Sequence, residues 1–351
     1  GLGERCSVLQ LNLYSLGIIP FMTNLEFIVT GGAGFVGSNF LRHMINEYPD
    51  YSFVNVDKLT YSGNLKNVED LKGKENYRFF LADICDSKRI EEVISAGSFV
   101  VNFAAESHVD NSITGPRIFS ETNVVGTVNL LEAARKKGAG LFVQISTDEV
   151  YGSLNLKDRS SREDEALRPR SPYSASKAAA EEFCQGYFHT FKLPIVITRS
   201  SNNFGPYQFP EKVIPLFVTN LIQDKKVPLY GTGKNVRDWI YVQDNCEAID
   251  FIIHNGEIGE VYNIGGGNEL SNIELTKRIL QAMGKDDSFI EYVEDRKGHD
   301  LRYALECRKI HSLGWRPRFK FEDALMKTID WYKENEDWWA PLKNIEGRRT
   351  S

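Results

Sequence analysis

Tyr173 and Lys177 form the pattern Y-x-x-x-K in the segment SPYSASKAAAE, at the start of a predicted helix. Residues four apart on a helix lie on one face, so this spacing brings the phenol and the ammonium together. A free phenol has a pKa of about 10 and is a poor base at neutral pH. A nearby ammonium stabilises the phenolate and lowers that pKa, so the pair predicts a base that takes a proton from a hydroxyl group.

Ser146 and Thr147 close a short apolar run and can hydrogen-bond the same substrate oxygen as the tyrosine. A Y-x-x-x-K match alone usually marks only a helix surface. Here Tyr173 follows the Ser-Thr pair by 26 residues, in a chain that also carries a glycine-rich turn. This combination predicts a catalytic site.

The glycine-rich turn is GGAGFVG, with Gly31, Gly34 and Gly37 between a predicted strand and a predicted helix. The three glycines allow a tight turn, close approach of the backbone to a pyrophosphate, and close packing of helix on strand. Asp57 ends the next strand, where a carboxylate accepts hydrogen bonds from a ribose diol and repels a 2′-phosphate. The pattern predicts an NAD site, and the alternative is a structural turn with a solvated aspartate.

Strands and helices alternate along the first part of the chain. Short apolar runs predict buried strands at 25–30, 52–56, 77–81, 99–103, 141–146 and 195–198, with helices that include 39–47, 122–137 and 174–189. Such βαβ units build a doubly wound parallel sheet of the α/β class, with ligands at the carboxyl ends of its strands.

A smaller, interleaved α/β substrate-binding domain is expected because this rhythm breaks after residue 198. We assign residues 22–200 to the dinucleotide-binding domain, which also receives about 235–260. Residues 201–234 and 261–340 are assigned to the substrate domain, and 1–21 to a leader or extension.

Composition excludes several classes of partner. The 48 acidic and 42 basic residues give a net charge of −6 with no basic face, so nucleic acid is not expected. The five cysteines are odd in number and far apart, which fits neither a disulfide framework nor a metal site and favours the reducing cytoplasm. The broken apolar stretch at 1–21 is too short to span a membrane, and we expect no membrane partner.

The chain resembles the extended short-chain dehydrogenase/reductases, which have a Rossmann-type fold, and specifically the dTDP-glucose 4,6-dehydratases. The similarity covers about residues 25–343. The segments that carry it are TGGAGFVGSNF, VDKLTYSGNL, FAAESHVD, STDEVYG, SPYSASKAAAE, SSNNFGPYQFPEKVIPL, VRDWIYV, YNIGG and DRKGHDLRYA.

This resemblance implies an NAD-dependent hydro-lyase of deoxysugar biosynthesis that converts dTDP-glucose to its 4-keto-6-deoxy product. Tyr173, supported by Lys177, is expected to take the proton of the sugar 4-hydroxyl while NAD⁺ accepts the C4 hydride. Glu149 then removes the C5 proton and Asp148 protonates the departing C6 hydroxyl. Hydride then returns to C6 and C5 is reprotonated. Thr147 completes the expected catalytic set, and epimerases of the superfamily lack the Asp148-Glu149 pair.

The resemblance also assigns residues to both ligands. On the cofactor side, besides the three glycines, they are Phe35, Val36, Asp57, Lys58, Leu59, Thr60, Asp83, Ile84, Phe103, Ala104, Ala105, Ser107, Thr122, Ser146, Tyr173, Lys177 and Asn203. On the substrate side they are Ser107, His108, Thr147, Asn202, Glu211, Lys212, Val213, Pro228, Leu229, Tyr230, Arg237, Asn272, Arg296 and His299.

Other functions remain open at this point. A UDP-glucose 4,6-dehydratase shares the chemistry, and an epimerase or decarboxylase shares the fold; the RDW and GHD strings favour the dTDP branch. A more distant alternative is a catalytically silent NAD-sensing regulator, although such proteins tend to lose the Tyr or the Lys, and both are intact. Family members commonly form dimers through the helices at 122–137 and 174–189, so a homodimer is expected.

Overall fold

The computed structural model describes residues 24–295 and 298–346. Seven parallel strands form its main sheet, in the order β10-β6-β5-β4-β1-β2-β3. The strands are β1 (Glu26–Thr30), β2 (Ser52–Asp57), β3 (Tyr77–Leu81), β4 (Phe99–Asn102), β5 (Leu141–Thr147), β6 (Ile195–Ser200) and β10 (Val261–Ile264). The chain reverses its direction across the sheet between β1 and β4, which is where such sheets bind ligands.

Both faces of this sheet are buried, which explains why its strands read as continuous apolar runs. Successive side chains of a strand point to opposite faces. Accordingly, Phe27 and Val29 belong to one hydrophobic cluster and Ile28 to another on the far side. The aromatic ring of Phe27 packs against Phe53 of β2 and Phe99 of β4, with centroids 5.5 and 5.4 Å away.

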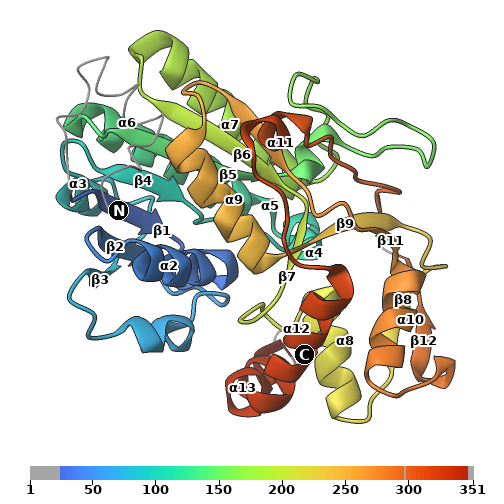
Figure 1. Cartoon of the computed structure of the whole chain (residues 1–351). Helices are drawn as coiled ribbons and strands as arrows, with labels where there is room; N and C mark the ends of the chain where they lie inside the picture. Colours follow the sequence, from blue (N-terminus) through green and yellow to red (C-terminus); the bar gives the residue numbers. More distant parts are fainter. Residues whose placement is uncertain (1–23, 296–297, 347–351) are drawn as a thin grey trace.

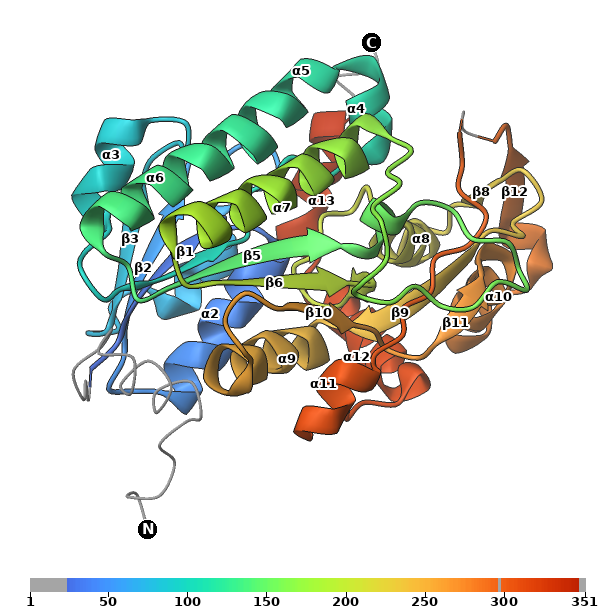
Figure 2. The ribbon, with the colours of Figure 1, turned by 90° about the horizontal axis from the view of Figure 1, so that it is seen from above.

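Helices cover the two faces (Figures 1 and 2). One face carries α2 (Phe35–Glu47) and α9 (Val242–Asn255), whose apolar residues share a cluster with Phe27. The other face carries α3 (Ser87–Val93), α6 (Thr127–Lys137) and α7 (Pro172–Phe191). Shorter helices connect these layers; they are η1 (Leu65–Leu71), α4 (Val109–Thr114), α5 (Pro116–Phe119), η2 (Ser120–Gly126) and η3 (Asp148–Tyr151).

The smaller lobe lies beyond the carboxyl ends of the main strands (Figure 1). Its strands form a sheet of order β11-β9-β7 and a parallel pair, β12 with β8. They are β7 (Asn202–Phe204), β8 (Val227–Tyr230), β9 (Val236–Tyr241), β11 (Glu269–Ser271) and β12 (Ile290–Val293). Its helices are α8 (Val213–Ile222), α10 (Asn272–Ala282), η4 (Asp287–Phe289), α11 (Arg308–Leu313), α12 (Phe321–Glu334) and α13 (Glu336–Glu346).

The predicted fold class is confirmed, and the differences are local. The helix expected from residue 39 begins at Phe35, because the backbone of the glycine turn already starts its hydrogen bonding, with Ser38 N donating to Gly34 O. Strand β10 comes from the range assigned to the smaller lobe, yet it pairs with β6 and extends the main sheet. The domain boundaries themselves stay a prediction, and the leader at 1–21 lies outside the described residues. Within those residues, no helix combines the length and apolarity needed to cross a membrane.

A buried carboxylate joins α2 to α9. Oxygens of Asp250 lie 2.7 Å from Nε2 of His43 and 2.8 Å from Nδ1 of His254. The Tyr48 hydroxyl donates to the same carboxylate at 3.0 Å, and the Tyr48 ring stacks on His254. Burial acts to raise the pKa of Asp250, but the hydrogen bonds from His254 and His43 outweigh it and lower the pKa to about 2.

We therefore expect Asp250→Asn to destabilise the fold by on the order of 2 kcal/mol at neutral pH. Because the folded-state pKa is depressed, the contribution of Asp250 is full above about pH 4 and is lost as pH falls toward 2. Thermal melts across this range should show the two proteins converging at low pH. Asp330→Asn, at an exposed position of α12, is the matched control. A constant difference between wild type and Asp250→Asn at all pH values would contradict this account.

Candidate active site

The glycine turn is packed directly against the end of β4. Gly31 has φ 70°, and a Cβ built on it would lie 2.6 Å from Ala104 N. A Cβ on Gly37 would lie 2.4 Å from Gly31 O. Side chains at these positions would push the backbone segments apart, so glycine is required for the packing. The turn brings the N-terminus of α2 to the cavity, where its free N–H groups favour an anion.

Asp57 fastens this turn to the end of β2. Its Oδ2 accepts a hydrogen bond from Ala33 N at 3.0 Å, and its Oδ1 accepts one from Leu59 N at 2.8 Å. Burial raises the pKa of Asp57, and these N–H donors act against the rise. The ammonium of the neighbouring Lys58 is held by Asp83 Oδ2 at 3.3 Å and Thr122 Oγ1 at 3.4 Å.

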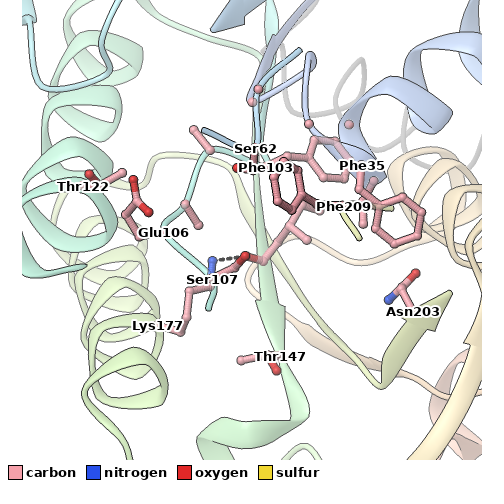
Figure 3. A pocket seen from close by; sticks show the side chains of 18 of the residues that line it. Phe35, Ser62, Phe103, Glu106, Ser107, Thr122, Thr147, Lys177, Asn203 and Phe209 are labelled. Carbon is pink, nitrogen blue, oxygen red and sulfur yellow. Dashed lines mark hydrogen bonds between the residues drawn. The ribbon is translucent and has the colours of Figure 1, made fainter. Parts of the chain in front are cut away.

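One cavity contains both the expected cofactor residues and the acid–base set. Figure 3 shows part of its lining, including Thr147 and Lys177. The expected cofactor residues that line it are Gly31, Gly34, Phe35, Val36, Gly37, Asp57, Lys58, Thr60, Ile84, Phe103, Ala104, Ala105, Ser107, Thr122, Ser146, Tyr173, Lys177 and Asn203. The expected catalytic and substrate residues that line it are Thr147, Asp148, Glu149, Asn202, Glu211 and Lys212. Leu59 and Asp83 do not line it, but they form hydrogen bonds with Asp57 and Lys58.

Thr147 connects the members of the acid–base set. Its hydroxyl donates to Asp148 Oδ1 at 3.2 Å and accepts from Glu149 N at 3.3 Å. It also lies close enough to Tyr173 to act against the rise of the phenol pKa. Three side chains from β5, η3 and α7 therefore meet at the carboxyl end of one strand.

Asp148 has the properties of an acid that stays protonated at neutral pH. It is buried, and its Oδ2 has no hydrogen-bond partner among the described residues. Burial and the adjacent charge of Glu149 raise the pKa of Asp148 to about 8, against the opposing effect of Arg237. Two neighbouring carboxyl groups whose environments differ in this way can serve as acid and base.

The expected lowering of the Tyr173 pKa by Lys177 stays a prediction, and other influences oppose it in the protein chain. Burial and the negative charge of Glu149 raise the pKa of Tyr173 above its ordinary value. The Lys177 ammonium instead donates to the main-chain carbonyl of Ile145 at 2.6 Å. Burial lowers the pKa of Lys177 to about 8, and Glu181 opposes that shift. The i, i+4 spacing places both groups at the cavity without pairing them.

The residues expected to hold the substrate lie in two places. Lys212 is at the cavity and donates to Ser107 O at 3.2 Å, while His108 and Glu211 face each other at 4.0 Å. Arg237 is buried beside the acid–base set, and its guanidinium lies 4.3 Å from the Tyr303 ring centroid.

The other expected substrate residues do not line the main cavity. They are His108, Val213, Pro228, Leu229, Tyr230, Arg237, Asn272 and His299. Leu229 is buried in the core, whereas Tyr230 and His299 approach one another edge to face at 6.3 Å. Arg296 lies outside the described residues. The roles of all these residues stay predictions.

Sequence reasoning missed a second cavity that shares Glu149 with the first. It is lined also by Arg170, Asp300 and Tyr303. Nη1 of Arg170 lies 3.2 Å from Asp300 Oδ1, and the Tyr303 hydroxyl donates to Oδ2 of the same carboxylate. Asp300 and Tyr303 belong to the segment DRKGHDLRYA, so that segment was the available signal. Within residues 24–295 and 298–346, no cluster of three His, Cys, Asp or Glu side chains is arranged to bind a metal.

The chain is similar to known proteins over most of its length. A family model described as GDP-mannose 4,6 dehydratase matches residues 28–328. The low-salt glycan biosynthesis protein Agl12 of Haloferax volcanii is 48% identical over 313 residues, which cover 89% of this chain and 100% of that protein. A dTDP-glucose 4,6-dehydratase of Escherichia coli is 46% identical over 346 residues, covering 90% and 95%.

A solved structure is similar to this chain over a comparable length and at a comparable identity. DesIV, a dTDP-glucose 4,6-dehydratase from Streptomyces venezuelae crystallised with NAD bound, matches with a TM-score of 0.88 at 47% identity. The match covers 91% of this chain and 100% of that one. The range matched by the family model contains the glycine turn, the acidic pair and the Y-x-x-x-K pattern.

We expect Gly37→Ala to weaken dinucleotide binding at least tenfold, because its methyl group must displace the Gly31 carbonyl. Isothermal titration with NAD⁺ after removal of any bound nucleotide measures the affinity. Gly186→Ala is the control, since a Cβ there has no atom within 4 Å and the residue lies within helix α7. Equal affinities for Gly37→Ala and wild type would show that the turn does not carry the nucleotide.

Proposed function

The chain belongs to the GDP-mannose 4,6-dehydratase family, and on this premise we propose that it converts dTDP-glucose to dTDP-4-keto-6-deoxyglucose. The observation that carries the proposal is the acidic pair Asp148-Glu149 in the same cavity as Tyr173 and Lys177. Relatives named as dTDP-glucose 4,6-dehydratases, in Escherichia coli and Streptomyces venezuelae, support this substrate. The enzyme is an NAD-dependent hydro-lyase on a dehydrogenase fold.

The residues of the chain fit NAD as the resident cofactor. Gly31 and Gly37 let the backbone approach a pyrophosphate, and the carboxylate of Asp57 lies at the end of β2 where a ribose diol is recognised. Lys58 is engaged by Asp83 and Thr122, so its charge is already partly balanced. When bound, NAD⁺ supplies a hydride acceptor for the sugar and a positive charge within the cavity.

Tyr173 is the proposed base for the sugar 4-hydroxyl. A phenolate is needed for this step, and the burial that raises its pKa must be offset by positive charge in the cavity. Thr147 lies beside the phenol and donates a hydrogen bond to Asp148, so it lies between the base and the acid. Lys177 contributes charge from its site against Ile145 O.

Asp148 and Glu149 are the proposed acid and base of the elimination. Asp148 is protonated at neutral pH, because its pKa is about 8, and can donate that proton to the departing C6 hydroxyl. Once C4 is a ketone, the C5 proton is acidic, and Glu149 is the proposed base that removes it. Its position next to Asp148 lets proton removal and proton donation occur on neighbouring carbons.

Lys212, Arg237, Arg296 and His299 are the proposed contacts to the nucleotide half of the substrate. Arginine suits a diphosphate because its guanidinium forms paired hydrogen bonds. UDP-glucose carries the same sugar and diphosphate, so it is the competing substrate that an assay must include. The acidic pair and the intact Tyr-Lys pair disfavour an epimerase, a decarboxylase and a silent NAD-sensing regulator.

We also propose that the protein is a cytoplasmic homodimer. Large apolar side chains are exposed along α4, α5, η2 and α7, which lie on one face of the molecule (Figure 2). They are Ile113, Ile118, Val125, Phe183 and Phe191, each more than 40% exposed. Such a face is typical of a protein interface. The free thiols of Cys85, Cys184, Cys246 and Cys307 support a reducing compartment.

Incubation with dTDP-glucose and no added NAD should yield a nucleotide sugar lighter by one water, detected by mass spectrometry. Asp148→Asn and Glu149→Gln should each slow this elimination about 10²–10⁴-fold, as expected for a lost general acid or base. Both variants should retain NAD. The rate of the wild type should fall above about pH 8, where both Asp148 and Lys177 lose their protons.

Three other outcomes are informative. Activity that requires added NAD keeps the chemistry and indicates a loosely held cofactor. Turnover of UDP-glucose but not dTDP-glucose moves the assignment to the competing dehydratase. Full activity of both carboxylate variants would refute the assigned roles.

We expect Phe183→Asp to convert the dimer to a monomer, because a charge would be placed in the apolar face of α7. Size-exclusion chromatography with light scattering gives the mass. Leu156→Asp, which alters an even more exposed apolar side chain in the 152–170 connection, is the control and should leave the mass unchanged. A wild-type mass of one chain would refute the dimer.

A further inference from the structure

A buried carboxylate lies one helical turn beyond the catalytic lysine. Glu181 follows Lys177 by four residues on α7 and is 1% exposed. Its Oε2 accepts hydrogen bonds from Nε and Nη2 of Arg199, at 2.9 and 2.6 Å. Its Oε1 is buried and has no hydrogen-bond partner among the described residues. The i, i+4 spacing directs this carboxylate toward the same face of the helix as Lys177.

Charge balance at Lys177 depends on this carboxylate. The lysine is buried, and its ammonium donates to a neutral partner, the carbonyl of Ile145, at 2.6 Å. Burial lowers the pKa of Lys177 to about 8, and the negative charge of Glu181 acts against the decrease. Besides Glu181, Cys184 on the same helix acts on Lys177. Asp148 and Glu149 on η3 act on Tyr173, and Arg199 on β6 pairs with Glu181.

Arg199 connects this carboxylate to the acidic pair. Its Nη1 donates to the hydroxyl of Tyr151 at 2.7 Å, and the guanidinium lies 4.7 Å from the Tyr151 ring centroid. Tyr151 ends the η3 turn that begins at Asp148. One buried guanidinium therefore joins the helix that carries Tyr173 and Lys177 to the turn that carries Asp148 and Glu149.

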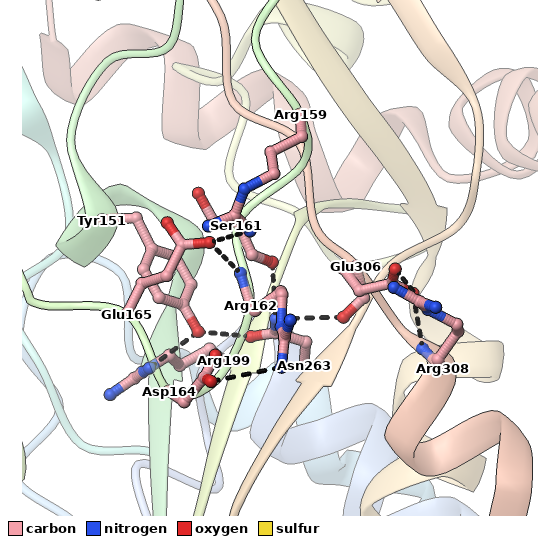
Figure 4. Close-up of polar contacts among 10 residues, drawn as sticks. All are labelled: Tyr151, Arg159, Ser161, Arg162, Asp164, Glu165, Arg199, Asn263, Glu306 and Arg308. Carbon is pink, nitrogen blue, oxygen red and sulfur yellow. Dashed lines mark hydrogen bonds and ion pairs between the residues drawn. The ribbon is translucent and has the colours of Figure 1, made fainter.

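The connection continues to β10 at the edge of the main sheet (Figure 4). Tyr151 donates to Asn263 Oδ1 at 2.8 Å, and Asn263 Nδ2 donates to the carbonyls of Ser161 and Glu306 at 3.0 and 3.1 Å. A buried ion pair is seldom more stabilising than apolar residues of the same volume. The Glu181–Arg199 pair contacts both the helix of Tyr173 and Lys177 and the turn of Asp148 and Glu149. Its presence is therefore better explained by an effect on these catalytic residues than by stability.

We propose that Glu181 is a positioning residue of the reaction: paired with Arg199, it keeps Lys177 charged and fixes its helix against the Asp148-Glu149 turn. The expected change in kcat rests on the proposed function, because it is measured with dTDP-glucose. The effect of Glu181 on Lys177 is a property of the protein itself and can be measured without turnover.

The direct test is the titration of Lys177 in protein labelled with carbon-13 at lysine Cε, with the Lys177 signal identified by its loss in Lys177→Met. Glu181→Gln should lower the titration midpoint by about one pH unit or more. Glu182→Gln, the same change at the next and exposed residue of α7, should leave the midpoint unchanged. Tyr151→Phe removes a link to η3 without changing any charge, so it should lower kcat and leave the midpoint in place.

The second test measures the steady-state kinetics of the Glu181 variants. At pH 8, Glu181→Gln should reduce kcat for dTDP-glucose about tenfold, shift the alkaline limb of the pH profile to lower pH, and change KM less than twofold. Glu181→Asp, which keeps the charge, should restore most of kcat. Loss of kcat with an unchanged Lys177 midpoint and an unchanged pH profile would overturn the proposal, because it would indicate a merely structural role.

The proposal can still be tested if Glu181→Gln does not fold or if the wild type is inactive. Should Glu181→Gln not fold, the double variant Glu181→Gln/Arg199→Met removes both buried charges together, and its Lys177 midpoint must still fall. A wild-type midpoint in that variant overturns the proposal. If the wild-type protein is inert toward dTDP-glucose, the proposed function fails, while the Lys177 titration still decides whether Glu181 acts on the lysine.

Discussion

The tight contact between the glycine turn and the end of β4 is the constraint on which the active site depends. There is no space for a side chain between Gly31 and Ala104, so the turn, the N-terminus of α2 and the strand end form one rigid edge. Asp57 locks the same turn to β2. Because parallel strands end at the same edge, the residues that follow β5 face this turn across a single cavity.

Acid–base chemistry in this cavity follows from burial. A carboxyl group removed from water beside a second carboxylate retains its proton near neutral pH, as Asp148 does. Burial also favours the neutral form of Lys177, which for a lysine means that its proton is lost more easily. The chain therefore needs a compensating negative charge near the lysine but none added near Asp148, and the buried Glu181-Arg199 pair lies on the lysine side.

Much of this arrangement could be predicted from sequence because it is encoded locally. The apolar runs predict the strands. The residues of the cavity are predicted by the glycine turn, Asp57 and the spacing of Tyr173 and Lys177. Contacts between distant segments could not be predicted: Arg199 with Tyr151, Arg170 with Asp300, and the Lys177 bond to a main-chain carbonyl depend on three-dimensional packing. The pairing of β10 with β6 was missed for the same reason, since residues 201–260 lie between the two strands.

The late arrival of β10 also has a consequence for biosynthesis. Until residues 261–264 leave the ribosome, β6 is an open strand edge in a growing sheet, and all six of its residues are buried in the finished protein. Unpaired apolar edges of this kind promote association between nascent chains. Long-range parallel pairing is also slow to form. Successful folding in the cell therefore depends on keeping this edge protected during translation of the intervening segment.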